Sequence, residues 1–124
     1  MIRIIDEKTN ISDLKMKIKK FCEDRDWDQF HNAKDLAIGI STEASELLDK
    51  FRFKTEKEIE EMFKSNIKKQ EISDEMADVL YFLLRMAQKY EIDISKELIL
   101  KLEKNEKRYP LEKAKGSNKK YTEL

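Results

Sequence analysis

The sequence has few of the residues that reverse a chain: its 124 residues include two glycines, one proline and a single valine. An average domain of this length carries about 15 glycines and prolines together. Hairpin and Greek-key folds need Gly, Pro or Asn-Gly at nearly every reversal. These shortages argue against an all-β sandwich or barrel and favour a helical protein.

Cysteines and long hydrophobic runs are equally scarce. The single cysteine, Cys22, excludes an internal disulfide. No apolar run approaches the roughly 18 residues that a membrane-spanning helix needs, and the apolar start before Asp6 is too short for a signal peptide. We therefore expect a cytoplasmic protein with no membrane partner.

The chain also has no excess charge of either sign, because 26 basic residues balance 26 acidic ones. Binding to nucleic acid depends on a basic excess, so nucleic acid is not an expected partner. Leu, Ile, Val and Phe make up 32 of the 124 residues, above the share of about 20% below which chains stay disordered. We expect a folded domain whose long helices would gain from a second subunit.

Apolar residues recur every three or four positions along most of the chain, as in amphipathic helices. The expected helices cover residues 12–26, 33–52, 56–67 and 70–90, and a last one runs from Asp93 to a stop at Tyr109-Pro110. Capping boxes mark the starts at Asn32 and Thr55. Residues 1–110 are interpreted as an all-α, four-helix-bundle-like domain, and residues 111–124 as a basic C-terminal tail that belongs to the same functional unit.

Two of the expected helices place acidic pairs within an apolar stripe. At 100° per residue, Glu43 aligns with Leu47, and Glu46 lies one turn beyond Glu43. Glu75 has the same kind of position on the later helix, with Asp78 one turn beyond it. An isolated carboxylate in an apolar interior costs several kcal/mol. Two such pairs facing each other would therefore bind a cation. The alternative is that these glutamates pair with lysines or face solvent.

The composition limits which metal ions the site could bind. One histidine and one cysteine exclude the usual zinc ligand sets, and the Glu-x-x-His motif of di-iron bundles is absent. Carboxylate sites favour Mg²⁺ or Mn²⁺, which in enzymes commonly serve phosphates. Without a Gly-x-x-x-x-Gly-Lys-Ser/Thr loop, phosphate would be held by metal and basic side chains. Residues 101–124 offer eight basic against four acidic residues, although a solvated tail explains them equally well.

Several motifs together carry a family resemblance. They are Glu43-x-x-Glu46 followed after 28 residues by Glu75-x-x-Asp78, the run Glu23-Asp-Arg-Asp-Trp-Asp-Gln-Phe-His31, Glu43-Ala-Ser-Glu-Leu-Leu, Asp78-Val-Leu, Asn105 before Arg108-Tyr-Pro110, and Lys120-Tyr-Thr-Glu-Leu124. Over residues 21–124 the chain resembles the all-α nucleoside triphosphate pyrophosphatases of the MazG and dimeric dUTPase superfamily, and within it the MazG-like dCTP pyrophosphatase branch.

The resemblance implies an activity and an assembly. The activity is a Mg²⁺-dependent hydrolysis, with Mn²⁺ as a substitute, of a (deoxy)nucleoside triphosphate to its monophosphate and pyrophosphate, in nucleotide-pool sanitation. The substrate would be a pyrimidine such as dCTP or a modified nucleotide, and the assembly a homodimer or homotetramer. Glu43, Glu46, Glu75 and Asp78 would hold the metal as catalytic residues, and one of these glutamates would orient the attacking water.

The resemblance also implies a set of substrate-binding residues. These are Trp27, Asp28, Gln29, Phe30, His31, Phe53, Phe82, Asn105, Tyr109, Lys120 and Tyr121. Reasoning from the residues alone leaves alternatives for three of them, because Trp27 and Phe53 could fill a core and His31 could close a helix start.

Three positions depart from the pattern of the branch. Phe53 stands where Trp is usual, Phe82 where Tyr is usual, and Ile18 where some members have His. Each change removes a hydrogen-bonding group, and such groups give a pocket its strongest discrimination. Strict selectivity for dCTP is therefore not expected. A non-catalytic helical protein-interaction module is the alternative function.

Overall fold

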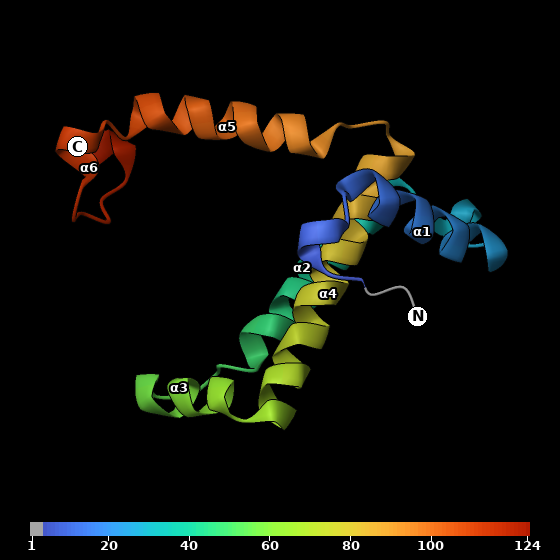
Figure 1. The fold of residues 1–124 in the computed structure, drawn as a ribbon, viewed down its shortest axis with the longest axis horizontal. Helices are drawn as coiled ribbons and strands as arrows, with labels where there is room; N and C mark the ends of the chain where they lie inside the picture. The colour runs from blue at the N-terminus through green and yellow to red at the C-terminus, as the bar shows by residue number, and fades with distance from the viewer. Residues whose placement is uncertain (1–3) are drawn as a thin grey trace. The chain divides into compact units, whose positions relative to one another are not determined.

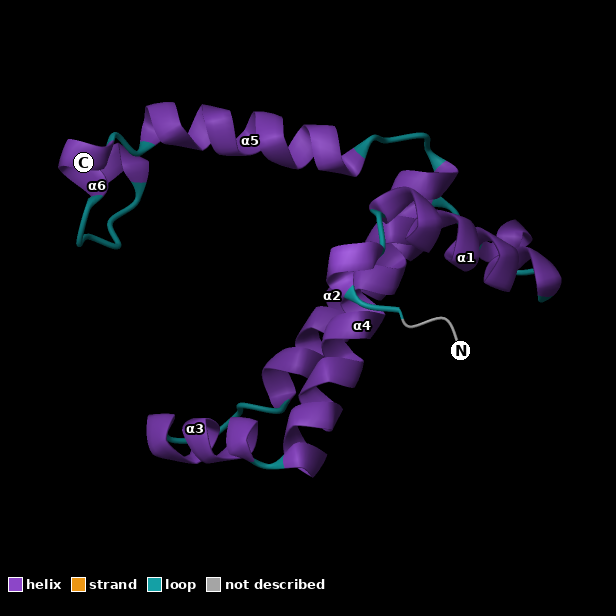
Figure 2. Ribbon diagram, viewed as in Figure 1, coloured by secondary structure: helices purple, strands orange, loops and turns teal. Residues whose placement is uncertain are grey.

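The computed structural model describes residues 4–124, and over that range the chain is all-α (Figures 1 and 2). The helices are α1 (Ile11–Asp24), α2 (Ala33–Asp49), α3 (Glu56–Lys64), α4 (Asn66–Lys89), α5 (Ile94–Arg108) and α6 (Leu111–Ala114), with 3-10 turns η1 (Asp6–Lys8), η2 (Asp28–Phe30) and η3 (Tyr121–Glu123). The described residues contain no strand. The all-α prediction is confirmed.

Side-chain caps explain where the helices begin. The backbone N–H of Asp35 donates to Asn32 Oδ1 at 2.9 Å at the start of α2, and the N–H of Glu58 donates to Thr55 Oγ1 at 3.2 Å at the start of α3. Both residues expected to begin these helices, Asn32 and Thr55, therefore act as N-caps. The expected break between residues 67 and 70 is wrong, because Ser65 caps α4 by accepting from the N–H of Lys68 at 3.3 Å.

The chain forms two compact units, Met1–Glu91 and Ile92–Leu124. In the first unit α2 lies along α4, and α1 and α3 also contact α4 (Figure 1). The fully buried apolar side chains are Cys22, Leu36, Ile72, Leu84 and Ala87. Helix α4 is thus the central element of this unit, in contact with each of its other α-helices.

A glycine sets the spacing between α2 and α4. A Cβ atom on Gly39 would lie 2.6 Å from the Phe82 ring, closer than any ordinary contact. The ring of Phe82 consequently packs against the bare backbone of α2. This close approach occurs one helical turn before Glu43.

The second unit contains α5, α6 and η3. The Tyr109 and Tyr121 rings meet edge to face with centroids 6.0 Å apart, and the Arg108 guanidinium lies 4.7 Å from the centre of the Tyr121 ring. Residues 111–124, expected as a tail, thus contain two short helical turns connected to the end of α5. The domain boundary at residue 110 stays a prediction.

Several apolar side chains of α5 are unburied in the single chain. Leu98, Ile99, Leu100 and Leu102 are each 46–58% exposed. None of the described helices combines the length and apolar character needed to cross a membrane.

Candidate active site

Three acidic side chains converge where α2 lies along α4. One carboxylate oxygen from each of Glu43, Glu75 and Asp78 lies within 4.8 Å of the others. Glu43 and Glu75 are half-buried and Asp78 is exposed. The two helices pack through their apolar stripes, and this packing brings the three acids together, as the helical spacing predicts.

Glu46 extends this group to four carboxylates, called here the acidic cluster. A hydrogen bond with Glu43, and the negative charge of that residue, raise the pKa of Glu46. Burial raises the pKa of Glu75, and hydrogen bonding and repulsion with Glu46 raise it further, while the charge of Lys50 acts against the shift. Without a cation, the cluster therefore retains protons that isolated carboxyls would lose.

Two atoms of the acidic cluster have no partner. Glu43 Oε2 and Glu75 Oε2 are buried without a hydrogen bond. Unpaired buried carboxylate oxygens are costly, and the donors are all oxygen atoms, which suit a hard divalent cation. The residues present thus fit a Mg²⁺ or Mn²⁺ ion. Pairing with lysines does not satisfy these two atoms.

A cavity of about 530 Å³ opens beside the acidic cluster, between α1 and α4. It is lined by Lys17, Ile18, Phe21, Trp27, Ala77, Asp78 and Tyr81. Asp78 belongs both to the acidic cluster and to this cavity, so the two features are continuous. We call this space the aromatic cavity.

The aromatic side chains of the cavity contact one another edge to face. The Phe21 ring centroid lies 5.6 Å from that of Trp27 and 6.1 Å from that of Tyr81. The Tyr81 hydroxyl lies 3.2 Å from the buried Cys22 Sγ, and burial raises the pKa of Tyr81. Tyr81 therefore presents a protonated phenol whose hydroxyl already has a partner.

A buried arginine holds the segment that follows Trp27. Arg85 is 1% exposed. Its Nε donates to His31 Nδ1 at 2.9 Å and its Nη2 donates to Asp28 Oδ1 at 2.5 Å. The hydrogen bond from Arg85 holds the pKa of Asp28 below its ordinary range. Burial and the charge of Arg85 lower the pKa of His31.

The other residues predicted for the first unit have separate positions. Gln29 donates to the carboxylate and carbonyl oxygens of Asp26, and Phe30 is exposed. Phe53 is 89% exposed, with a positive φ of 61°, and does not fill a core. Phe82 packs on Gly39 and against Tyr81, with ring centroids 5.0 Å apart.

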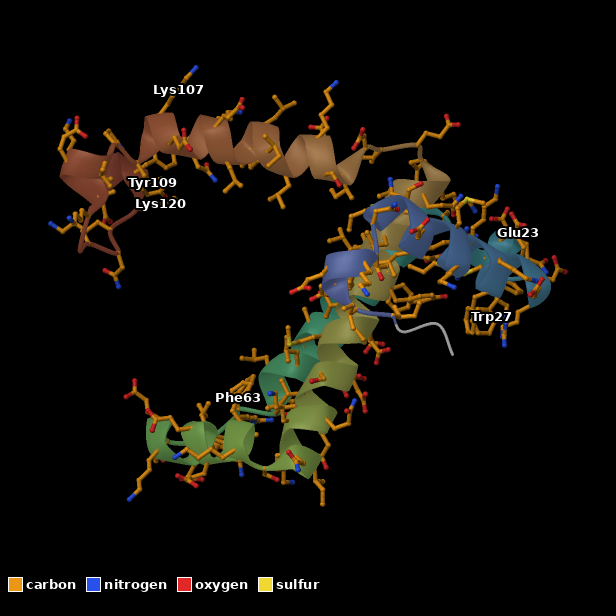
Figure 3. The ribbon with its side chains drawn as sticks, viewed as in Figure 1. Glu23, Trp27, Phe63, Lys107, Tyr109 and Lys120 are labelled. Atoms are coloured by element: carbon orange, nitrogen blue, oxygen red, sulfur yellow. The ribbon has the colours of Figure 1, made fainter. Side chains whose placement is uncertain are left out.

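The predicted residues of the C-terminal part belong to the second unit, where Tyr109 contacts Tyr121 and Asn105 is half-buried. Figure 3 shows Tyr109 and Lys120 at the α6 end of that unit, and Trp27 beside the last turns of α1. The roles assigned to Asn105, Tyr109, Lys120 and Tyr121 stay predictions.

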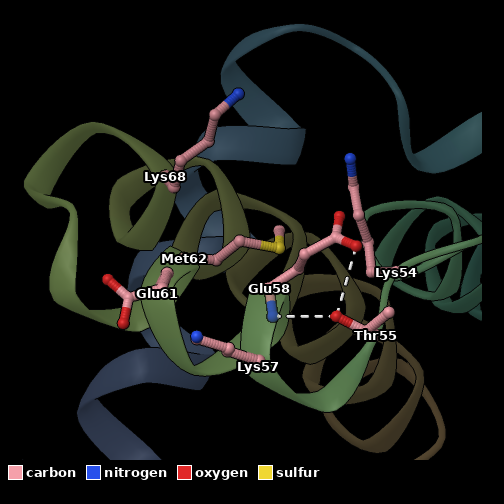
Figure 4. A pocket seen from close by; sticks show the side chains of 7 residues that line it. All are labelled: Lys54, Thr55, Lys57, Glu58, Glu61, Met62 and Lys68. Atoms are coloured by element: carbon pink, nitrogen blue, oxygen red, sulfur yellow. Dashed lines mark hydrogen bonds between the residues drawn. The ribbon is translucent and has the colours of Figure 1, made fainter.

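A second cavity, of about 430 Å³, lies between α3 and the first turn of α4 (Figure 4). Its lining residues are Lys54, Thr55, Lys57, Glu58, Glu61, Met62 and Lys68. The hydroxyl of Thr55 donates to the carboxylate of Glu58 at 3.2 Å, and both residues lie in the wall of this cavity. None of the predicted site residues lines this cavity.

Sequence reasoning missed Arg85, Tyr81 and Phe21. Periodicity assigns Phe21 to ordinary packing and does not single out Tyr81, so nothing distinguishes them as cavity walls. Arg85 did leave a signal, because it is the one charged residue in the otherwise apolar run Leu83-Leu84-Arg85-Met86-Ala87. A buried arginine requires hydrogen-bond acceptors, but no local pattern identifies which residues supply them.

Comparison with known proteins places these features in a family. The MazG-like family model matches residues 38–124. Human dCTP pyrophosphatase 1 is 32% identical over 114 residues, covering 92% of this chain and 67% of the human protein. Its Bos taurus counterpart is 29% identical and is covered to 68%.

A solved structure agrees with the sequence relatives. The crystal structure of a pyrophosphatase from Archaeoglobus fulgidus superposes with a TM-score of 0.76 at 33% identity, covering 87% of this chain and 99% of that chain. The chain belongs to the MazG-like family, which confirms the resemblance drawn from its motifs.

Proposed function

We propose that this chain is a Mg²⁺-dependent nucleoside triphosphate pyrophosphohydrolase, which converts a (deoxy)nucleoside triphosphate and water to the monophosphate and pyrophosphate. One observation carries the proposal: a four-carboxylate cluster with two unpartnered buried oxygens shares Asp78 with an aromatic cavity. The activity printed in the names of the relatives supports it.

The acidic cluster would hold the ion through Glu43, Glu46, Glu75 and Asp78. Bound there, Mg²⁺, or Mn²⁺ in its place, offsets the charge of the triphosphate and acidifies water. The carboxylates orient the attacking water. One of the glutamates Glu43, Glu46 and Glu75 would accept the proton of the attacking water.

The aromatic cavity would receive the base and sugar. Its volume of about 530 Å³ lies within the range of about 300–1,000 Å³ typical of small-molecule sites. Trp27 offers a face on which a base stacks. We propose a pyrimidine such as dCTP or a modified nucleotide as the substrate. Because Ile18 and the aromatic rings offer few hydrogen bonds, discrimination between bases is weak.

Further binding residues and the assembly complete the proposal. Phe53, as an exposed ring on a left-handed turn, is available to a nucleotide or to another subunit. The exposed apolar side chains of α5 support a homodimer or homotetramer, since a second copy would bury them. We place the activity in the cytoplasm, in sanitation of the nucleotide pool.

The test is a panel of canonical and modified nucleoside triphosphates incubated with the purified protein and Mg²⁺, with products separated by ion exchange. Monophosphate and pyrophosphate in equal amounts are expected for at least one nucleotide. Diphosphate and orthophosphate, or no product from any nucleotide, would contradict the proposal. An incubation with chelator instead of Mg²⁺ is the control, and it should give no product.

A further inference from the structure

Arg85 is the one charged side chain that is fully buried among the described residues. Its guanidinium donates from Nε to His31 Nδ1, from Nη2 to Asp28 Oδ1, and from Nη1 to Gln88 Oε1 at 2.6 Å. Lys89 adds a bond from Nζ to the backbone carbonyl of Asp28 at 2.8 Å. We call Arg85, Asp28, His31, Gln88 and Lys89 the Arg85 network.

The Arg85 network joins two parts of the site that are far apart in sequence. Arg85 follows Asp78 by seven residues on α4, nearly two full turns, so the two lie along the same side of the helix. Asp28 and His31 belong to the segment after α1 that carries Trp27. The helix that supplies half of the acidic cluster therefore also binds the segment that carries the cavity's tryptophan.

His31 connects this network to the ring of Trp27. The two rings meet edge to face, with centroids 6.4 Å apart. Because His31 Nδ1 accepts from Arg85, the neutral ring carries its proton on Nε2. Trp27 is therefore followed directly by Asp28 and contacts an oriented His31, and both of these residues accept hydrogen bonds from Arg85.

We propose that Arg85 is a positioning residue for nucleotide binding: it holds Trp27 at a fixed place relative to the acidic cluster. The inference rests on the proposed function, in which Trp27 stacks on the base. A purely structural arginine would support the fold without affecting substrate affinity selectively. A positioning arginine controls the Michaelis constant through Trp27 and leaves metal binding intact.

The test compares Arg85→Met with Arg85→Lys. Arg85→Met removes every donor, and we expect KM for the best nucleotide of the panel to rise about tenfold or more while kcat changes less than about threefold, the pattern of lost ground-state binding. Arg85→Lys keeps the charge but not the forked geometry, so it should recover part of the affinity. Mg²⁺ affinity, titrated without nucleotide, should match that of the wild type in both.

The fluorescence of Trp27 gives a readout that needs no turnover. Trp27 is the only tryptophan of the sequence, so its emission and its quenching by acrylamide report this segment alone. In Arg85→Met we expect a red shift and faster quenching in the native protein. Arg85→Lys should lie between Arg85→Met and the wild type.

Leu84→Ala is the matched control, because Leu84 is the adjacent fully buried residue of α4 and is not in the network. It should lose stability without raising KM or changing the Trp27 emission. The inference is overturned if Arg85→Met leaves KM and the emission at wild-type values, or if Leu84→Ala reproduces both changes. Should Arg85→Met fail to fold, Arg85→Lys decides by the same criteria. An inactive wild-type protein would instead contradict the proposed function, and the fluorescence would still test the network.

Discussion

At the scale of single residues, the two unpaired oxygens on Glu43 and Glu75 are the feature that most needs an explanation. A fold without a ligand gains nothing from burying them. The raised pKa values of Glu46 and Glu75 likewise show that ionising these carboxyls is unfavourable without a cation. In an enzyme that binds a cation here, the carboxylates are already arranged for the ion, and this arrangement lowers the stability of the metal-free form.

The substitution Glu75→Gln tests whether the acidic cluster binds a cation and lowers the stability of the metal-free protein. The change removes one charge from the acidic cluster, so we expect activity to fall about a hundredfold or more. The metal-free protein should melt at the same temperature or higher, because repulsion between neighbouring carboxylates is relieved. Steady-state rates and thermal melts measured without Mg²⁺ check both expectations.

Glu71→Gln is the control for this change, since Glu71 lies one turn earlier on α4 and pairs with Lys68 at 3.5 Å. It should retain wild-type activity. A large loss of folded protein in Glu75→Gln would show that Glu75 has a structural role and would contradict a metal-binding one.

The protonation of His31 gives a prediction for stability against pH. Burial and Arg85 lower the pKa of His31 from its ordinary 6.5, so below about that pH the unfolded chain binds a proton that the folded chain resists. His31 therefore reduces stability as the pH falls through and below 6.5. The lowered pKa of Asp28 acts in the same direction in a more acidic range, below its ordinary 3.8.

Urea unfolding at several pH values between 5 and 8 measures this effect. The raised pKa values of Glu46 and Glu75 oppose it, because those groups bind protons more readily in the folded state. The comparison with His31→Gln isolates the histidine: the stability of the wild type should decline toward acid more than that of the variant. Parallel curves would contradict the assignment.

At the scale of elements, the contact between Gly39 and Phe82 positions α2 against α4. Gly39→Ala normally stabilises a helix by about 1 kcal/mol. Here the added methyl would lie 2.6 Å from the Phe82 ring, so we expect a net loss of about 1–3 kcal/mol from overpacking. The helices should separate near Glu43, which would weaken Mg²⁺ binding.

Chemical unfolding and Mg²⁺ titration of Gly39→Ala measure the two effects. The double change Gly39→Ala with Phe82→Leu provides the control, because the smaller side chain leaves room for the methyl. It should recover Mg²⁺ affinity. If Gly39→Ala is as stable as the wild type and binds Mg²⁺ equally well, the spacing does not depend on this contact.

The sequence predicted the helices well where a local signal marks them. Asn32 and Thr55 cap as expected, and the alignment of Glu43 and Glu75 within apolar stripes puts them together across α2 and α4. The start of α4 was missed because Ser65 caps it without a capping-box acid. The partners of Arg85 could not be predicted, since residues 54 and 57 positions away lie beyond any local pattern.

At the scale of the whole molecule, a chain with no net charge concentrates four carboxylates in one place and aromatic side chains beside them. The net charge of zero therefore does not reveal that one site gathers enough negative charge to need a cation. The sequence comparisons cover most of this chain and support the same interpretation. The exposed apolar side chains of α5 are among the features that a single chain leaves unexplained.

The exposed apolar side chains of α5 predict self-association. Size-exclusion chromatography with light scattering should give two or four times the mass of one chain. Replacing Leu98 and Leu102 by glutamate places charges in the expected interface, so the mass should fall toward that of a single chain. The same replacement at Lys101 and Lys104 is the control. A monomeric wild type at high micromolar concentration would contradict the prediction.

The proposed function depends on the acidic cluster directing water to the α phosphorus of a nucleoside triphosphate. Hydrolysis in ¹⁸O-labelled water with Mg²⁺, followed by mass spectrometry of both products, tests it directly. We expect one ¹⁸O atom in the nucleoside monophosphate, none in pyrophosphate, and no product from Glu75→Gln on the same timescale. Label in pyrophosphate, release of orthophosphate, or no hydrolysis at all, as a helical interaction module would give, would contradict it.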